Sequence, residues 1–120
     1  MSNRTARRVA GIVGCCGILF GAFGAHMLHG LLQKNATTGI WETGVLYHLV
    51  HALALLVLSG WRPVPYGAFV LMLGGVITFS GSLYFFSLTN IRWLGVITPI
   101  GGLGMLAGWL VLAFSKSDKA

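Results

Sequence analysis

Histidine and tyrosine are the side chains of this sequence best suited to metal binding or proton transfer. His26 stands at the end of one apolar run, and Tyr47, His48 and His51 lie close together in the next. Tyr47 and His51 are four residues apart and His48 and His51 are three apart, so each pair shares a helix face. Imidazole ligates haem iron, zinc and copper, and it carries protons near neutral pH. The same side chains can instead join helices through hydrogen bonds.

Other polar side chains occur in the later apolar runs, where isolation from water favours pairing among them. We expect His26 and His51 to hold the first two helices in register, and Tyr47, Ser80 and Tyr84 to complete a hydrogen-bond network. His29 lies nearer a loop, and we expect it at the membrane interface. The candidate polar cluster or ligand site comprises His26, Tyr47, His48, His51, Ser80, Ser82, Tyr84, Arg92 and Thr98.

The composition indicates an integral membrane protein. Apolar residues make up 56% of the chain, charged residues only 8%, and the mean hydropathy is +0.83. A soluble domain has about 25% charged residues. The net charge of +6 comes from basic residues at the ends of apolar runs. Because they form no basic face, nucleic acid is not expected as a partner.

Apolar runs near the ~20 residues that cross a hydrocarbon core predict four membrane-spanning helices in a single domain, residues 1–120. Asn90 is expected as the N-cap of the last helix, and the prolines of the 62–65 turn favour a helix start. The fold class is an all-α membrane protein, a four-helix bundle. The predicted helices are about 9–28, 44–61, 66–89 and 93–114.

The distribution of lysine and arginine predicts the direction of the spans. Basic side chains concentrate on the cytoplasmic side of membrane proteins. With the N-terminus inside, six basic residues lie inside and two lie outside, so both termini are predicted to be cytoplasmic. The inner six are Arg4, Arg7, Arg8, Arg62, Lys116 and Lys119, and the outer two are Lys34 and Arg92.

Small residues four apart predict close helix packing, because they let helix backbones approach each other in lipid. Pro99 cannot donate a backbone hydrogen bond, so we expect a kink in the last helix. The predicted packing residues are Gly17, Gly21 and Ala25 in the first helix and Gly104 and Gly108 in the fourth.

The two acidic residues argue against one class of transporter. Small four-span multidrug exporters depend on a carboxylate buried in the first helix, and here the acids are Glu42 and Asp118. Glu42 is expected at the start of the second helix, where its charge favours the helix dipole. Asp118 belongs to the C-terminal tail. A proton-coupled transporter would therefore have to use histidine.

Four segments of the chain resemble the signature segments of a small inner-membrane family, domain of unknown function 423, and most closely its YgdD branch. The resemblance covers about residues 9–114. It implies a four-span protein of the bacterial cytoplasmic membrane and supplies no reaction. The family usually has Gln where this chain has His48, which leaves His26 and His51 as the better pair. The segments are 21–26, 47–54, 79–84 and 97–102.

We therefore expect a multi-pass inner-membrane protein that is not an enzyme and acts through membrane lipids, another membrane protein or a second copy of itself. No cofactor or metal is predicted. One alternative is a haem- or metal-binding membrane module that uses His26 and His51. The other is a histidine-based proton-coupled small transporter.

Overall fold

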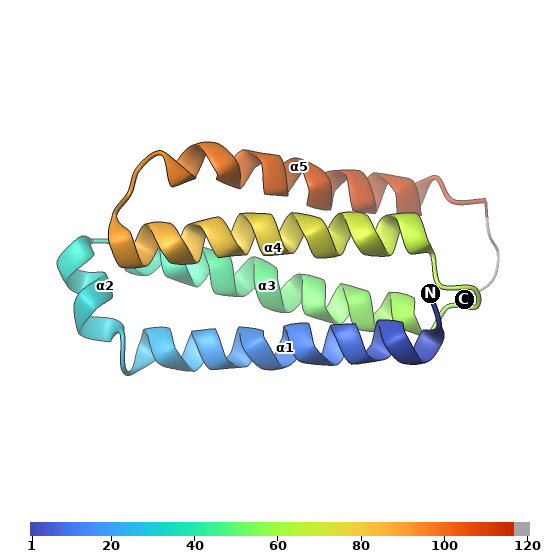
Figure 1. The fold of residues 1–120 in the computed structure, drawn as a ribbon, viewed down its shortest axis with the longest axis horizontal. Helices are drawn as coiled ribbons and strands as arrows, with labels where there is room; N and C mark the ends of the chain where they lie inside the picture. Colours follow the sequence, from blue (N-terminus) through green and yellow to red (C-terminus); the bar gives the residue numbers. More distant parts are fainter. Residues whose placement is uncertain (117–120) are drawn as a thin grey trace.

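The computed structural model describes residues 1–116, and these form five helices joined by short connections (Figure 1). Four of the five are long and apolar enough to cross a membrane, and no strand occurs in the described range. The predicted all-α fold with four spans is confirmed. Asp118 and Lys119 lie outside the described residues. The helices are α1 Asn3–Ala25, α2 His29–Asn35, α3 Thr38–Ser59, α4 Tyr66–Thr89 and α5 Leu94–Ala113.

The first two long helices begin six residues earlier than predicted. At the start of α1, the Ser2 hydroxyl accepts a hydrogen bond of 3.0 Å from the backbone N–H of Thr5. This cap carries the helix into the polar N-terminus. At the start of α3, Thr37 and Trp41 are both buried. Hydropathy marks where lipid surrounds a helix, so it does not detect a first turn that is held by caps or by neighbouring helices.

The segment between the first two long helices contains a short helix that the sequence pattern did not predict. α1 ends at Ala25 instead of residue 28, and α2 follows between the first two predicted spans, 9–28 and 44–61. Leu32 anchors α2 because its side chain is 1% exposed. Ala36 then adopts a left-handed conformation, with φ of 56°, and ends the helix. This compact cap covers one end of the molecule.

Asn90 ends one helix and does not begin the next, so its predicted role as an N-cap is wrong. It is the C-cap of α4 with φ of 58°, a left-handed conformation that asparagine tolerates better than most residues. Its side-chain amide donates a hydrogen bond of 3.3 Å to the carbonyl of Asn35. The N-cap of α5 is Trp93. Asn90 therefore ties the end of α4 to the end of α2.

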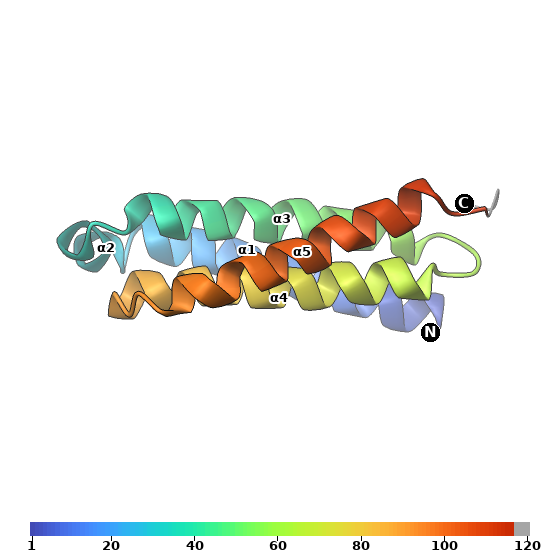
Figure 2. The same ribbon diagram turned by 90° about the horizontal axis from the view of Figure 1, so that it is seen from above.

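The long helices pack in the order α1, α3, α4, α5 (Figures 1 and 2). Within residues 1–116, no Cα atom of α1 comes within 8 Å of α4 or α5, and none of α3 within 8 Å of α5. The helix bundle measures 49 × 26 × 17 Å, and its long axis compares with the ~40–45 Å thickness of a bilayer including its head groups. Only side chains bridge α1 and α4, and only side chains bridge α3 and α5.

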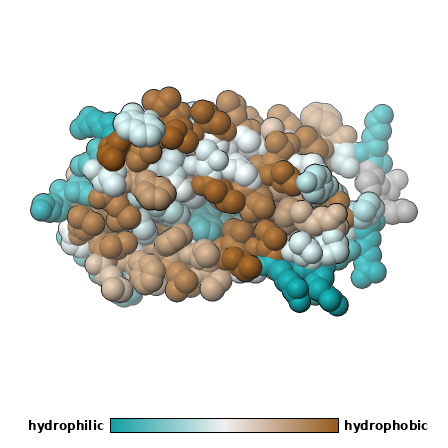
Figure 3. All heavy atoms as spheres, viewed as in Figure 1, coloured by the Kyte–Doolittle hydropathy of each residue, from teal (hydrophilic) through white to brown (hydrophobic). Residues whose placement is uncertain are grey.

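Two apolar clusters fill the two ends of the bundle. The larger lies toward the chain termini and includes Leu55, Phe69 and Met72 from α3 and α4. The smaller lies beside α2 and includes Leu32, Trp41 and Tyr84. On the face that Figure 3 shows, the surface between the ends is mostly hydrophobic, and hydrophilic side chains gather at both ends. This distribution matches a molecule surrounded by lipid along its middle.

Glycines let α5 lie directly on α4. A Cβ atom added to Gly75 would stand 2.8 Å from the carbonyl oxygen of Gly101, and one added to Gly104 would stand 3.2 Å from the Cα of Gly75. Gly108 packs similarly on the backbone of Met72. The predicted packing residues Gly104 and Gly108 thus face α4. Such close backbone approach is how helices associate tightly in lipid.

On α1, Gly17 and Gly21 face α3, as close contacts with Leu49 and Val45 show. Ala25 was expected to continue this stripe, but it is exposed and the buried small residue is Gly24. Positions 17, 21 and 24 follow the helix repeat of 3.6 residues more closely than 17, 21 and 25. The row of small residues therefore ends at Gly24, and Trp41 packs against it.

We predict that Gly75→Ala lowers the stability of the protein in detergent by about 1–3 kcal/mol, because the new methyl group forces the backbones of α4 and α5 apart. The matched control is Gly74→Ala, where nothing lies within 4 Å of the added Cβ. This control should be neutral or stabilising by up to about 1 kcal/mol. Thermal unfolding followed by circular dichroism measures both. Equal midpoints for the two variants would contradict the close α4–α5 contact.

Candidate functional site

His48 joins three helices through its two ring nitrogens. Its Nε2 lies 2.8 Å from the carbonyl oxygen of Val13 in α1, and its Nδ1 lies 2.8 Å from the hydroxyl of Tyr84 in α4. A carbonyl oxygen only accepts, so we assign the proton to Nε2. Nδ1 then accepts from the Tyr84 hydroxyl. His48 is 9% exposed and Tyr84 8% exposed, so both rings are buried in the bundle.

The indole of Trp41 makes a second bond of the same kind, one heptad away. Its Nε1–H donates to the carbonyl oxygen of Phe20 at 2.9 Å. Each of the two donors lies over a glycine four residues beyond the carbonyl it reaches, Gly17 for His48 and Gly24 for Trp41. A Cβ atom at Gly24 would occupy the space of the Trp41 ring, and one at Gly17 would clash with the Leu49 side chain and stand 3.2 Å from the His48 ring. The two donors are seven residues apart on α3, and the two acceptors are seven residues apart on α1. Both hydrogen bonds therefore form in the same alignment of the two helices.

Aromatic rings enclose these bonds. The ring of Tyr84 packs against Phe20 and Trp41, with ring centroids 4.8 and 4.7 Å apart. Ser80, one turn before Tyr84 on α4, donates a hydrogen bond of 2.7 Å to the carbonyl oxygen of Gly44. The predicted residues Ser80, Tyr84 and His48 therefore lie on one α3–α4 interface. They form the centre of the polar cluster.

His51 connects α3 to α5. Its Nδ1 lies 2.8 Å from the backbone carbonyl of Tyr47, and the indole Nε1–H of Trp109 donates to its Nε2 at 3.0 Å. Because the carbonyl only accepts and the indole only donates, we assign the proton to Nδ1. The rings of Tyr47 and His51 lie nearly parallel, 14° apart. His51 and His48 are thus assigned opposite tautomers.

The remaining predicted residues are distributed differently. Ser82 and Thr98 form a hydrogen bond of 2.5 Å between α4 and α5. Pro99 lies inside α5 and is exposed. His26 is the exposed C-cap of α1, and its side chain makes no hydrogen bond within residues 1–116. The exposed Arg92 side chain likewise makes none in the described part. The expected pair of His26 and His51 is not formed, because α1 and α3 run antiparallel with Val13 beside His48 and Phe20 beside Trp41, which leaves His26 far from His51 along the bundle.

The bonded histidines use every ring nitrogen they have. Ligation of a metal or haem iron by His48 or His51 would require one of these hydrogen bonds to break. Among residues 1–116, no group of three or more His, Cys, Asp or Glu side chains is placed to hold a metal ion. In the observed geometry, each of the two histidines hydrogen-bonds a neighbouring helix.

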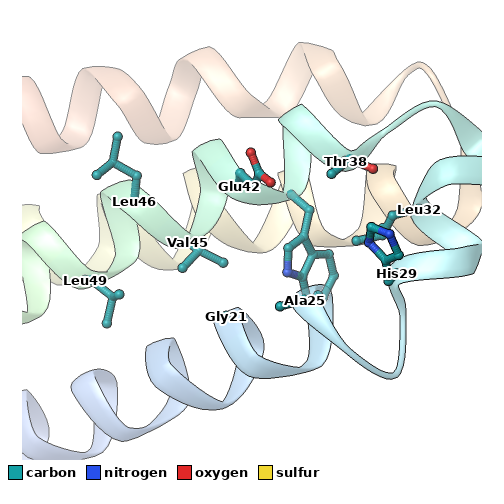
Figure 4. A pocket seen from close by; sticks show the side chains of 11 residues that line it. Gly21, Ala25, His29, Leu32, Thr38, Glu42, Val45, Leu46 and Leu49 are labelled. Carbon is teal, nitrogen blue, oxygen red and sulfur yellow. The ribbon is translucent and has the colours of Figure 1, made fainter.

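A lateral groove with a volume of about 580 Å³ opens between α1, α2 and α3 (Figure 4). Gly21 and Ala25 of α1 form one wall. Apolar side chains of α3, Leu46 and Leu49 among them, line the part toward the middle of the bundle, and polar side chains line the part beside α2 (Figure 4). The groove is therefore apolar toward the middle of the bundle and polar at the end beside α2. A molecule bound in the groove would contact the surrounding lipid on one side.

A family model described as "Protein of unknown function (DUF423)" matches residues 20–102. This range contains the groove-lining residues and most of the polar cluster. The chain belongs to this family. The resemblance noted from the four sequence segments is thereby confirmed, and the DUF423 relatives are named as membrane proteins.

Three DUF423 relatives illustrate the range of similarity. A UPF0382 membrane protein of Staphylococcus haemolyticus is 49% identical over 79% of this chain and 80% of its own length. YwdK of Bacillus subtilis is 43% identical over 77% of this chain and 79% of its own. The UPF0382 inner membrane protein YgdD of Escherichia coli is 35% identical over 93% and 88%. No solved structure matches the chain.

Several residues of the site in this DUF423 protein were not predicted. Trp41 and Trp109 were not among the predicted site residues, yet each donates a hydrogen bond to another helix. The signal for Trp41 was available in the sequence, since Trp41 and His48 are seven apart, as are Gly17 and Gly24. Trp109 carries no comparable signal. Its partner is 58 residues away along the chain.

We predict that Tyr84→Phe destabilises the protein by about 1–3 kcal/mol, because the Nδ1 acceptor of buried His48 loses its donor. Tyr47→Phe is the matched control, since the Tyr47 side chain is 41% exposed and its hydroxyl has no hydrogen bond in the described residues. Thermal unfolding in detergent or nanodiscs measures the difference. If both variants unfold at the wild-type temperature, the hydrogen bond between Tyr84 and His48 does not hold α3 to α4.

Proposed function

We propose that this protein is a non-enzymatic integral membrane protein that holds a membrane lipid in the groove between α1, α2 and α3. The observation that carries the proposal is the groove itself. It combines an apolar length, a polar end and an opening toward the lipid that surrounds the bundle. A phospholipid has the same division into an apolar chain and a polar head.

The hydrogen-bond network supports a structural role for the buried polar residues. His48 and His51 each fill one donor and one acceptor position with protein groups. A redox or metal site would need a free ligand, and a proton carrier would need a path from one histidine onward. The bonds of His48 end at the Val13 carbonyl, which cannot pass on a proton. His48 therefore holds α3 against α1, the two long helices that form the groove, and His51 holds α3 against α5.

We further propose that the protein lies in the bacterial cytoplasmic membrane with both termini in the cytoplasm. The exposed side chains of Arg4, Arg7, Arg8, Arg62 and Lys116 support this orientation, since they belong to the ends of α1, α3 and α5 that lie together (Figure 1). The inner-membrane name of YgdD also supports the location.

The orientation is tested by fusing alkaline phosphatase or green fluorescent protein to the C-terminus. The phosphatase should be inactive and the fluorescent protein bright, because the first folds only outside the cytoplasm and the second only inside. A matched pair of fusions within the loop that follows α4 should give the reverse. An active phosphatase at the C-terminus would overturn the proposed orientation.

We predict that Leu46→Trp reduces the amount of co-purified phospholipid by about tenfold, since a loss of 1.4 kcal/mol of contact corresponds to that factor. Leu46 is 60% exposed and lines the groove. Leu53→Trp is the matched control, because Leu53 lies one heptad further on α3, is 65% exposed and does not line the groove. Native mass spectrometry of the gently solubilised protein counts the lipids. Equal lipid content in wild type and both variants would contradict the proposal.

A further inference from the structure

Glu42 lies in the second turn of its helix, where the helix dipole does not explain it. From the sequence it was expected at the start of the second span. In the structure α3 begins at Thr38, and its first turn contains no acidic residue. Stabilisation of a carboxylate by the helix N-terminus falls off within the first turn. The structure therefore leaves the charge of Glu42 without its expected role.

Glu42 is also the one acidic residue in residues 1–116, against seven basic ones. No ion pair involves it within that range, and its side chain is exposed. A carboxylate near a membrane interface is held best by a positively charged partner. No basic side chain in residues 1–116 pairs with Glu42, so a cation from outside the chain would be its partner.

The residues near Glu42 indicate what kind of molecule the groove could bind. Val45, Leu46 and Leu49 follow at three, four and seven residues, on the same face of α3, and line the apolar part of the groove. Figure 4 shows Glu42, Thr38 and His29 toward the α2 end of this line. Seven residues of helix extend about 10 Å, roughly the upper part of an acyl chain. Along the groove, the carboxylate of Glu42 is therefore followed by a row of apolar side chains.

We infer that the groove binds a phospholipid whose head group ends in a primary ammonium, as in phosphatidylethanolamine, with the ammonium at Glu42 and an acyl chain along Leu46 and Leu49. This inference rests on the proposed lipid-binding function and specifies its ligand. A primary ammonium offers three N–H donors to a carboxylate, whereas a quaternary ammonium offers none. The imidazole of His29 and the hydroxyl of Thr38 make no hydrogen bond within residues 1–116 and are available to the lipid phosphate.

The test compares lipids that share their acyl chains and differ in the head group. Wild-type protein in mixed micelles is offered equal amounts of dioleoyl phosphatidylethanolamine, phosphatidylcholine and phosphatidylglycerol, and native mass spectrometry counts each bound lipid. We expect about fivefold more phosphatidylethanolamine than either competitor, the selectivity of a single ion pair near a surface. Glu42→Gln should bring the three lipids to equal occupancy without lowering the total.

Two control variants separate the charge from its position. Glu42→Asp keeps a carboxylate in the groove and should retain a preference for phosphatidylethanolamine. Asp118→Asn removes the other acidic side chain of the sequence, leaves every groove-lining residue in place and should bind as wild type does.

The outcomes distinguish the head-group inference from the proposed function. Bound lipid with no preference in wild type, or the same preference in Glu42→Gln, overturns the role of Glu42 and leaves lipid binding intact. Equal binding of phosphatidylcholine and phosphatidylethanolamine overturns the requirement for a primary ammonium. A loss of preference in Asp118→Asn assigns the effect to net charge and overturns the inference. Absence of any bound lipid in wild type removes the proposed function, and the inference with it.

Discussion

The fold depends on hydrogen bonds that side-chain N–H groups of α3 donate to backbone carbonyls of α1. In a membrane a buried donor has no water to bond, so it must find its acceptor in the protein. His48 and Trp41 reach Val13 and Phe20 because Gly17 and Gly24 leave room for their rings. Each bond fixes the distance, the rotation and the register of the two helices at once. Two such bonds, seven residues apart, permit one alignment of α1 on α3.

This alignment places α3 at the centre of the molecule and creates the groove. α3 bonds to α1 through His48, to α4 through the same ring and to α5 through His51. Glycines on both helices let the backbone of α5 lie directly on α4, and hydrogen bonds between Thr98 and α4 and between Trp109 and α3 also hold α5 in place. The backbone of α1 does not come close to a second long helix, and the end of α1 turns into α2. The space left between α1, α2 and α3 is the groove that we propose binds lipid.

The sequence predicts the spans better than the contacts between them. Apolar length alone places α4 correctly at residues 66–89, because lipid contact determines hydropathy there. It cannot show that His48, and not His26, joins α1 to α3, since both are histidines in apolar surroundings. The family's usual Gln at position 48 pointed away from His48, although an amide can also donate to a carbonyl. Gly24 and Ala25 are similarly alike in sequence, and only the helix phase shows which one faces Trp41.

The most direct test of this account is the protonation of the two buried histidines, measured by ¹⁵N solid-state nuclear magnetic resonance in lipid bilayers near neutral pH. Replacement of one histidine at a time by glutamine assigns the signals. We expect two neutral rings of opposite tautomer, with the proton of His48 on Nε2 and that of His51 on Nδ1. Identical tautomers, a doubly protonated ring or a shift typical of metal ligation would contradict the claim that these histidines fasten the helices.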